Sequence, residues 1–216
     1  MIFPQGPLCD SRPPHPKEGA FAYLSRCARS DADAVRSTID AWMADYPLEE
    51  AEHLVARLRS RQDDQHRAAF FELLLHRLLL ALGHRIEAIE PKLAHTWKSP
   101  DFQVAGFYVE GISAQGGDLH AALKRKASRY GVLDLPLVVA VNCPEDEAGL
   151  RRALDELWVG PRGPQRRILS AVLAVGQADP WNWRDSRLRL IRHPSPDHPL
   201  PPVDLGDGRR LGDLLV

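Results

Sequence analysis

Three carboxylates in the middle of the chain could share one chemical role. Glu72 interrupts the apolar segment 68–82, Asp101 follows Pro100, and Glu110 lies in a β-type segment shortly after. Hard divalent cations such as Mg²⁺ prefer carboxylate oxygens, and a bound cation lowers the pKa of a water and neutralises charge developing on a phosphodiester. Three such carboxylates could hold a divalent metal ion only if the fold brings them together.

The segments around these acids predict an α/β fold that could do so. Residues 68–82 are apolar almost all round, which is typical of a helix buried on more than one side, and Gly83 ends it. Three β-type segments follow, at 85–89, 102–105 and 107–112. Helical spacing returns over 118–130, and the continuously apolar segment 135–142 predicts a central strand covered on both faces. Asp101 then opens one strand of a hairpin whose partner carries Glu110, so the two side chains are expected to be neighbours.

The flanking segments predict a division of the chain into three parts. Residues 1–19 contain five prolines and predict a flexible arm outside the core. Residues 20–62 show helical spacing with a break at Tyr46-Pro47, which predicts a helical extension of two or three helices. Residues 63–216 then form the α/β domain. Its sheet is expected to gain further strands at 168–175 and 188–191.

The motif Pro100-Asp101, followed by a strand that carries Glu110, resembles the PD-(D/E)xK nuclease superfamily over roughly residues 66 to 142. The resemblance implies a restriction-endonuclease-like core of helix, three-strand meander, helix and strand. It also implies a metal-dependent phosphodiesterase, an endonuclease or exonuclease that acts on DNA with Mg²⁺ or Mn²⁺. In that family an acid on the first helix, the Asp of the motif and the acid of the next strand bind the metal. The matching residues here are Glu72, Asp101 and Glu110.

The chain departs from the family pattern where the catalytic lysine would stand, because that position is Ile112. Some relatives supply the cation from the following helix, and Lys126 is the best candidate for that role here. With Tyr130 it forms a Lys-x-x-x-Tyr spacing similar to the Gln-x-x-x-Tyr motif of the RecB-like branch, and this spacing presents both side chains on one helix face. Nucleic-acid contacts are further expected from basic or polar residues near the motif, namely Lys98, Gln115, Lys124 and Tyr130.

Structural roles for the same residues remain open. Glu72 is also suited to an internal ion pair with Arg77 or Arg125, because a buried carboxylate needs a partner. His76 is expected to be a packed helix residue and not a ligand. The aliphatic stem of Lys126 could serve only to cover the sheet.

A catalytically inactive nuclease-fold protein that acts as a binding or interaction module is the alternative function, and a protein partner or a homodimer fits it. Ile112 and the neutral net charge favour this alternative. Both the nuclease and the inactive binding module lead to the same expectation for the stability of the metal-free protein. If three acids converge without a metal, their repulsion predicts that Glu110→Gln raises the melting temperature.

Composition bounds these hypotheses. The 216 residues are 44% hydrophobic, and the formal net charge of −1 means that phosphate binding would require Lys and Arg to gather on one face. Three cysteines without a CxxC pair indicate neither a disulfide framework nor a zinc knuckle. P-loop, GxGxxG, GxSxG and HExxH motifs are absent from the sequence. No segment approaches 18 uninterrupted apolar residues and no leader pattern is present, so a cytoplasmic location without a membrane partner is expected.

Overall fold

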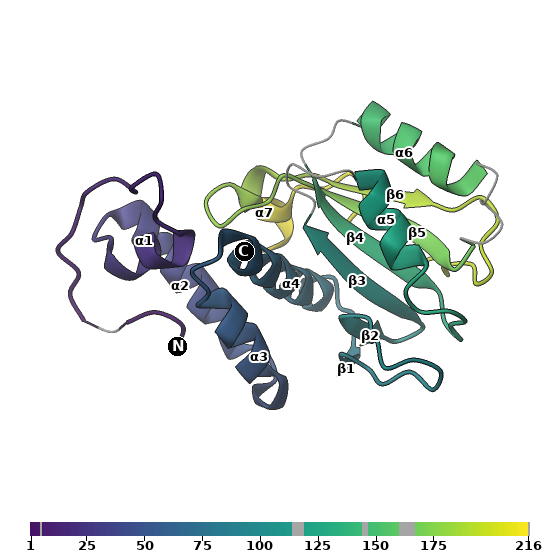
Figure 1. The fold of residues 1–216 in the computed structure, drawn as a ribbon, viewed down its shortest axis with the longest axis horizontal. Helices are drawn as coiled ribbons and strands as arrows, with labels where there is room; N and C mark the ends of the chain where they lie inside the picture. The colour runs from purple at the N-terminus through teal and green to yellow at the C-terminus, as the bar shows by residue number, and fades with distance from the viewer. Residues whose placement is uncertain (5, 114–118, 144–146, 160–166, 216) are drawn as a thin grey trace. The chain divides into compact units, whose positions relative to one another are not determined.

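The computed structural model describes residues 1–4, 6–113, 119–143, 147–159 and 167–215. The chain divides into two compact units, which are described separately here. Unit 1 comprises Met1–Arg77 with Asp179–Trp181, and unit 2 comprises Leu78–Ala178 with Asn182–Val216 (Figure 1). The sequence placed the boundary between residues 62 and 63. The observed boundary falls instead within helix α4 (Asp63–Ala81), because one continuous helix contributes side chains to both units.

Unit 1 is helical, as the spacing of its apolar residues predicted. Three helices precede α4, namely α1 (Ala20–Arg26), α2 (Ser30–Ala44) and α3 (Leu48–Leu58). Pro47 is the N-cap residue of α3, a position where its missing N–H removes no helical hydrogen bond. Ile39, Leu54 and Leu58 are fully or almost fully buried, so each of the two longer helices turns one apolar stripe into the core.

The proline-rich arm takes part in this core, so its expected exclusion is wrong. Ile2 and Phe3 are only 2% and 4% exposed. The backbone N–H of Ile2 donates to Oδ1 of Asp40 at 2.6 Å, and the ring of Phe3 stacks on Phe21 with 5.6 Å between centroids. Prolines restrict the unfolded chain and so reduce the entropy lost when an extended segment is laid against helices. Two apolar residues at its start are then enough to anchor it.

A mixed β-sheet forms the centre of unit 2. Six strands are found among the described residues: β1 (Ile86–Ile89), β2 (Phe102–Val104), β3 (Phe107–Ser113), β4 (Leu137–Cys143), β5 (Leu169–Gly176) and β6 (Leu188–Arg192). Their order in the sheet is their order in the sequence. Strands β1 to β3 form an antiparallel meander, β3, β4 and β5 are parallel, and β6 closes the edge antiparallel to β5. All six strands were predicted at these places, with β4 inside the sheet and β6 at its edge.

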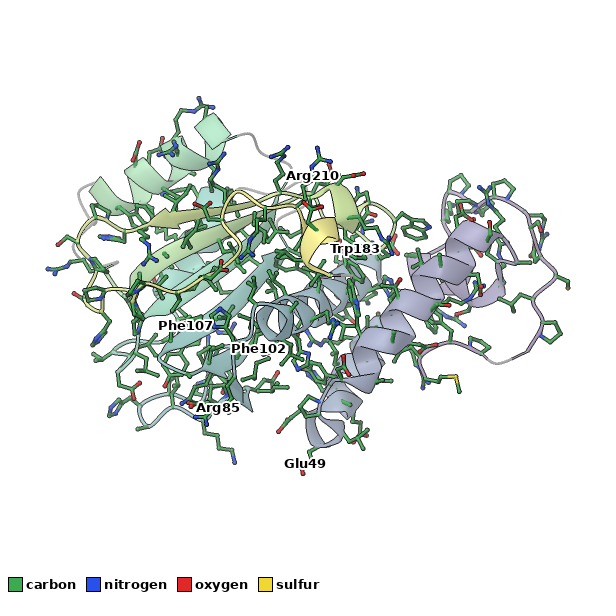
Figure 2. The ribbon with its side chains drawn as sticks, turned by 180° about the vertical axis from the view of Figure 1, so that it is seen from behind. Glu49, Arg85, Phe102, Phe107, Trp183 and Arg210 are labelled. Atoms are coloured by element: carbon green, nitrogen blue, oxygen red, sulfur yellow. The ribbon has the colours of Figure 1, made fainter. Side chains whose placement is uncertain are left out.

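Helices α5 (Leu119–Ala127) and α6 (Glu147–Val159) lie side by side over one face of this sheet (Figure 1). They connect parallel strands, and their apolar residues share one buried cluster with Tyr108 and Ile112 of β3. Phe102 and Phe107 are fully buried on the other face, which Figure 2 shows from behind. The sheet is therefore covered on both sides, and the side chains of Tyr108, Glu110 and Ile112 all point toward α5.

A short helical pair completes unit 2, formed by η2 (Trp183–Asp185) and α7 (Leu211–Leu214). No helix in the described part of the chain is long and apolar enough to span a bilayer.

Candidate functional site

Asp101 and Glu110 lie opposite each other at the end of the β2–β3 hairpin. Phe102 pairs with Val109, and the antiparallel register continued by one residue sets Asp101 against Glu110. The backbone N–H of Gly111 donates to Oδ2 of Asp101 at 2.6 Å, which fixes the Asp101 carboxylate against β3. Residues directly opposite in an antiparallel pair share a face of the sheet. The sequence-based expectation that these two carboxylates are neighbours is confirmed.

The Glu110 carboxylate is fully buried and is held by three donors. Lys126 forms an ion pair with Oε1, and Nη1 of Arg129 lies 3.2 Å from the same oxygen. The hydroxyl of Tyr130 donates to Oε2. Burial of a carboxylate without partners would cost several kcal/mol, and these contacts offset that cost. Glu110, Lys126, Arg129 and Tyr130, together with Asp101, are called the Glu110 cluster below.

The donors come from the end of α5 and the turn that follows it. The sequence predicted a helix over 118–130, but α5 ends at Ala127, and Arg129 and Tyr130 belong to the turn before Gly131, whose φ is +69°. Lys126 is therefore in the last helical turn and Tyr130 is beyond it. Both still reach Glu110, because the turn folds back over β3.

Tyr130 remains protonated in this setting. Its side chain is 1% exposed, and burial raises the pKa of its hydroxyl. The nearby positive charge of Arg129 acts in the opposite direction, and the negative charge of Asp101 adds to the rise. A high pKa keeps the phenol a hydrogen-bond donor to Glu110 throughout the physiological range. The same hydroxyl lies 3.2 Å from the carbonyl oxygen of Ser99, just before Asp101.

Ile112 points to the same side of β3 as Glu110 but offers it no charge. Its side chain is 8% exposed and packs in the apolar cluster beneath α5, together with Leu119 and Leu123. A lysine there would place an ammonium among hydrocarbon side chains. Lys126 approaches Glu110 from the helix above, with its side chain 23% exposed, so it can neutralise Glu110 without complete desolvation.

Glu72 belongs to unit 1 and has partners of its own there. It is 8% exposed, forms an ion pair with Arg57 of α3, and accepts a hydrogen bond from the Tyr46 hydroxyl at 3.2 Å. The alternative of an internal ion pair is thus observed, although the partner is one that the sequence did not single out. Arg77, which was considered, pairs with Asp45 at 3.0 Å.

The third expected ligand is therefore engaged elsewhere. Among the residues that the structure describes, no group of three or more His, Cys, Asp or Glu side chains is arranged to hold a metal ion. A cation at the Glu110 cluster would draw on two protein carboxylates, those of Asp101 and Glu110.

His76 is a packed residue, as expected. It is 2% exposed, and its ring centroid lies 4.6 Å from that of Tyr46. Burial lowers its pKa to about 4, while the charge of Asp45 acts to raise the pKa and that of Arg77 to lower it further. Because the unfolded state binds the proton more tightly, the folded state loses stability as the pH falls below 6.5.

We expect the protein to lose about 2 kcal/mol more unfolding free energy between pH 7 and pH 5 than a His76→Gln variant does. Urea unfolding of both proteins at the two pH values measures this difference. His66 and His193, whose pKa values burial also lowers, are common to both proteins and cancel in the comparison. Equal pH dependence in the two proteins would contradict the assignment of the effect to His76.

The other residues expected to contact nucleic acid differ in their surroundings. The ammonium of Lys98 lies 4.9 Å from the centroid of the Trp97 ring, and Lys124 is exposed on α5. Gln115 lies outside the described residues. Arg129 was not predicted, although its place beside Tyr130 and close to Lys126 in the sequence is the signal that could have found it.

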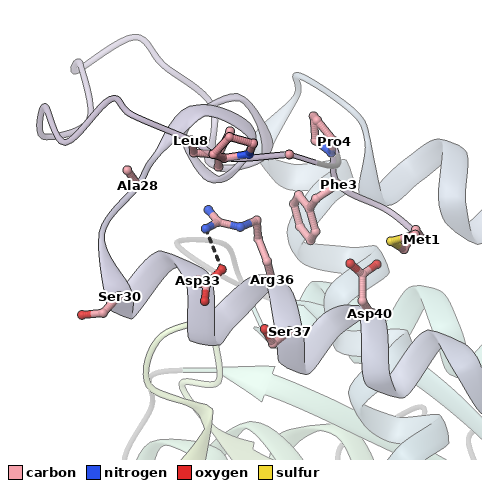
Figure 3. Close-up of a pocket in the computed structure, with 12 residues that line it drawn as sticks. Met1, Phe3, Pro4, Leu8, Ala28, Ser30, Asp33, Arg36, Ser37 and Asp40 are labelled. Carbon is pink, nitrogen blue, oxygen red and sulfur yellow. Dashed lines mark hydrogen bonds and ion pairs between the residues drawn. The ribbon is translucent and has the colours of Figure 1, made fainter.

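Unit 1 contains a separate cavity of about 810 Å³ between the N-terminal arm and α2 (Figure 3). Its most prominent charged group, Arg36, donates to the carbonyl oxygens of Leu24 and Cys27 and to Asp33. These bonds join α2 to α1, so Arg36 has a structural role in the cavity wall.

No family model matches the chain, and no curated protein or solved structure matches it.

Proposed function

We propose that unit 2 is a restriction-endonuclease-like domain and that the Glu110 cluster is the centre of a metal-dependent phosphodiesterase acting on DNA. The observation that carries the proposal is the ion pair of Lys126 with Glu110, opposite Asp101. It gives the two acids and one cation of the PD-(D/E)xK pattern, with the cation supplied by the following helix in place of Ile112. Positive charge held beside the acids stabilises charge that develops on a phosphodiester.

The order of elements supports the proposal. An antiparallel meander, β1 to β3, is followed by α5 and by β4, which is parallel to β3. This is the order of strands, helix and strand that the resemblance implies. Asp101 immediately precedes β2, Glu110 lies on β3, and Lys126 lies on α5, the helix that connects β3 to the parallel strand β4.

The distribution of charge around the cluster also supports a polyanionic substrate. Segments 91–100 and 119–131 contain no Asp or Glu. Their cations are Lys92, Lys98, Lys124, Arg125, Lys126 and Arg129. The contact between Ser99 and Tyr130 joins the two segments at the Glu110 cluster, so both acid-free segments border the cluster although the whole chain is nearly neutral.

The donor set fits a magnesium or manganese ion. Such ions are commonly held by one or two carboxylates, with waters and substrate phosphate oxygens completing the coordination. Asp101 and Glu110 would hold the ion, which when bound would activate a water and polarise the phosphate. Lys126 and Arg129, whose side chains are 23% and 34% exposed, cover the buried Glu110 and would move toward the substrate phosphate as the ion shares the carboxylate.

Metal binding is the direct test. We expect calorimetry with Ca²⁺ or Mn²⁺ to show saturable binding to the wild type, weakened about tenfold or more by Asp101→Asn, which keeps an acceptor for Gly111. Glu87→Gln on β1 is the control, because Glu87 is an acid of the same sheet that pairs with Arg85 at its surface. Absence of wild-type binding, or equal affinity in all three proteins, would refute the metal site.

One observation favours the inactive binding module as a second candidate. The charge of Glu110 is already compensated by Lys126 and Arg129, which is also what a purely structural buried acid requires. A wild type that binds nucleic acid but cleaves neither DNA nor RNA with Mg²⁺ or Mn²⁺ would establish this candidate.

A further inference from the structure

Trp97 lies on the surface of unit 2 with its ring exposed to solvent and not packed in the core. It is 88% exposed, whereas Trp42, Trp158 and Trp183 are at most 9% exposed. An indole is the largest apolar side chain, and leaving it in water forgoes the stabilisation that its burial would give. Trp97 therefore contributes little to the stability of the fold, and its ring is available to a ligand.

Lys98, the next residue in the chain, places its positive charge over the ring of Trp97. The ammonium of Lys98 lies 4.9 Å from the ring centroid, within the distance of a cation–π contact. An indole has two faces, and the high exposure of Trp97 leaves a face open to solvent. A flat aromatic surface and a positive charge thus lie side by side, which matches the base and the phosphate of one nucleotide.

This pair is tied to the Glu110 cluster. Trp97 and Lys98 belong to the connection between β1 and β2, which leads directly to Asp101. The carbonyl oxygen of Ser99 is 3.2 Å from the Tyr130 hydroxyl, which itself donates to Glu110. Since Trp97 precedes Ser99 by two residues, its Cα lies within about 7 Å of the Ser99 Cα. The exposed ring is accordingly at the border of the candidate active site.

We infer that Trp97 stacks on an unpaired base while Lys98 contacts the adjacent phosphate, so that the site takes a single-stranded nucleic-acid segment. In a duplex both faces of each base are covered by its neighbours, and an indole finds an open face only where bases are unpaired. This inference rests on the proposed function for the place of the site, and it adds the strandedness of the substrate. DNA and RNA share the chemistry involved.

Binding without cleavage tests the inference. Fluorescence anisotropy in EDTA would use labelled oligo-dT, oligo-U and a DNA duplex of equal length. We expect a single strand to bind more tightly than the duplex, and Trp97→Ala to weaken that binding roughly 5- to 150-fold, the range found for loss of one aromatic–base stack. Trp97→Phe should retain part of the affinity. Trp181→Ala is the matched control, because Trp181 is 44% exposed and belongs to unit 1.

The outcomes separate this inference from the proposed function. A preference for oligo-dT or for oligo-U, lost in Trp97→Ala, supports the inference and tells which nucleic acid is preferred. Equal binding of duplex and single strand, no wild-type binding, or unchanged binding by Trp97→Ala overturns it. Binding that depends on Trp97, without cleavage in Mg²⁺, would refute the phosphodiesterase and leave the inference standing. Cleavage of duplex DNA that does not depend on Trp97 would support the phosphodiesterase and overturn the inference.

Discussion

Under the proposed phosphodiesterase function, Lys126→Met is expected to lower the rate of phosphodiester cleavage by about 100-fold or more, the effect of removing one group that stabilises charge in a transition state. Methionine keeps most of the aliphatic stem and removes only the charge that pairs with Glu110. Steady-state cleavage of labelled DNA in Mg²⁺ measures the rate. Calorimetry on the same variant should show metal affinity retained, because Asp101 and Glu110 are unchanged.

Two further variants make the result specific to that ammonium. Lys124→Met removes an exposed charge from the same helix and should change cleavage only weakly, through substrate binding. Lys126→Arg keeps a positive charge over Glu110 and should retain part of the activity. Equal loss in the Lys124 and Lys126 variants would indicate general attraction of a polyanion, and the catalytic assignment of Lys126 would then fail.

Glu110→Gln is expected to lower the unfolding free energy by about 3 kcal/mol, near the lower end of the range for breaking a buried ion pair. The amide still accepts from Tyr130, but Lys126 and Arg129 lose the buried carboxylate with which they pair. Both cations are partly exposed and can turn toward water, which is why the lower value applies. Urea unfolding of the whole chain, followed by circular dichroism, measures the change.

The matched control for this prediction is Glu87→Gln. Glu87 pairs with Arg85, whose side chain is 79% exposed, and loss of such a surface pair costs about 1 kcal/mol or less. The sequence alone suggested that Glu110→Gln would stabilise the protein, by relieving repulsion between three acids. The observed partners of Glu110 reverse that expectation. A melting temperature raised by Glu110→Gln would show that repulsion outweighs the ion pairs.

The hairpin with Asp101 and Glu110 could be predicted because its determinants are local. Alternating apolar residues mark the strands, and Gly106, with a φ of +92°, forms the tight turn that fixes which residues face each other. The strand at β4 was predictable for a similar reason, since a continuous β-branched apolar segment suits only an interior position. Lys126 and Tyr130 were singled out by their resemblance to the Gln-x-x-x-Tyr motif, although Tyr130 lies beyond the end of α5 and not on its face.

The partners of Glu72 and Glu110 depend on contacts that spacing does not encode. Arg57 reaches Glu72 because α3 and α4 pack together, and the packing of two helices is set by many side chains at once. Arg129 reaches Glu110 because α5 ends at Ala127, and helix ends are the least predictable part of an element. The metal-binding role predicted for Glu72 also depended on such contacts, because it required segments far apart in the sequence to converge.

The strands lie in the sheet in the same order as in the sequence. This order affects how unit 2 can fold while the ribosome synthesises it. Each strand pairs with the one synthesised just before it, so the nascent chain always offers a finished edge to the next strand. No strand has to wait for a partner encoded much later, and none needs to be threaded between two existing strands. The sheet can accordingly grow from β1 to β6 during translation, which shortens the time that any apolar strand spends unpaired.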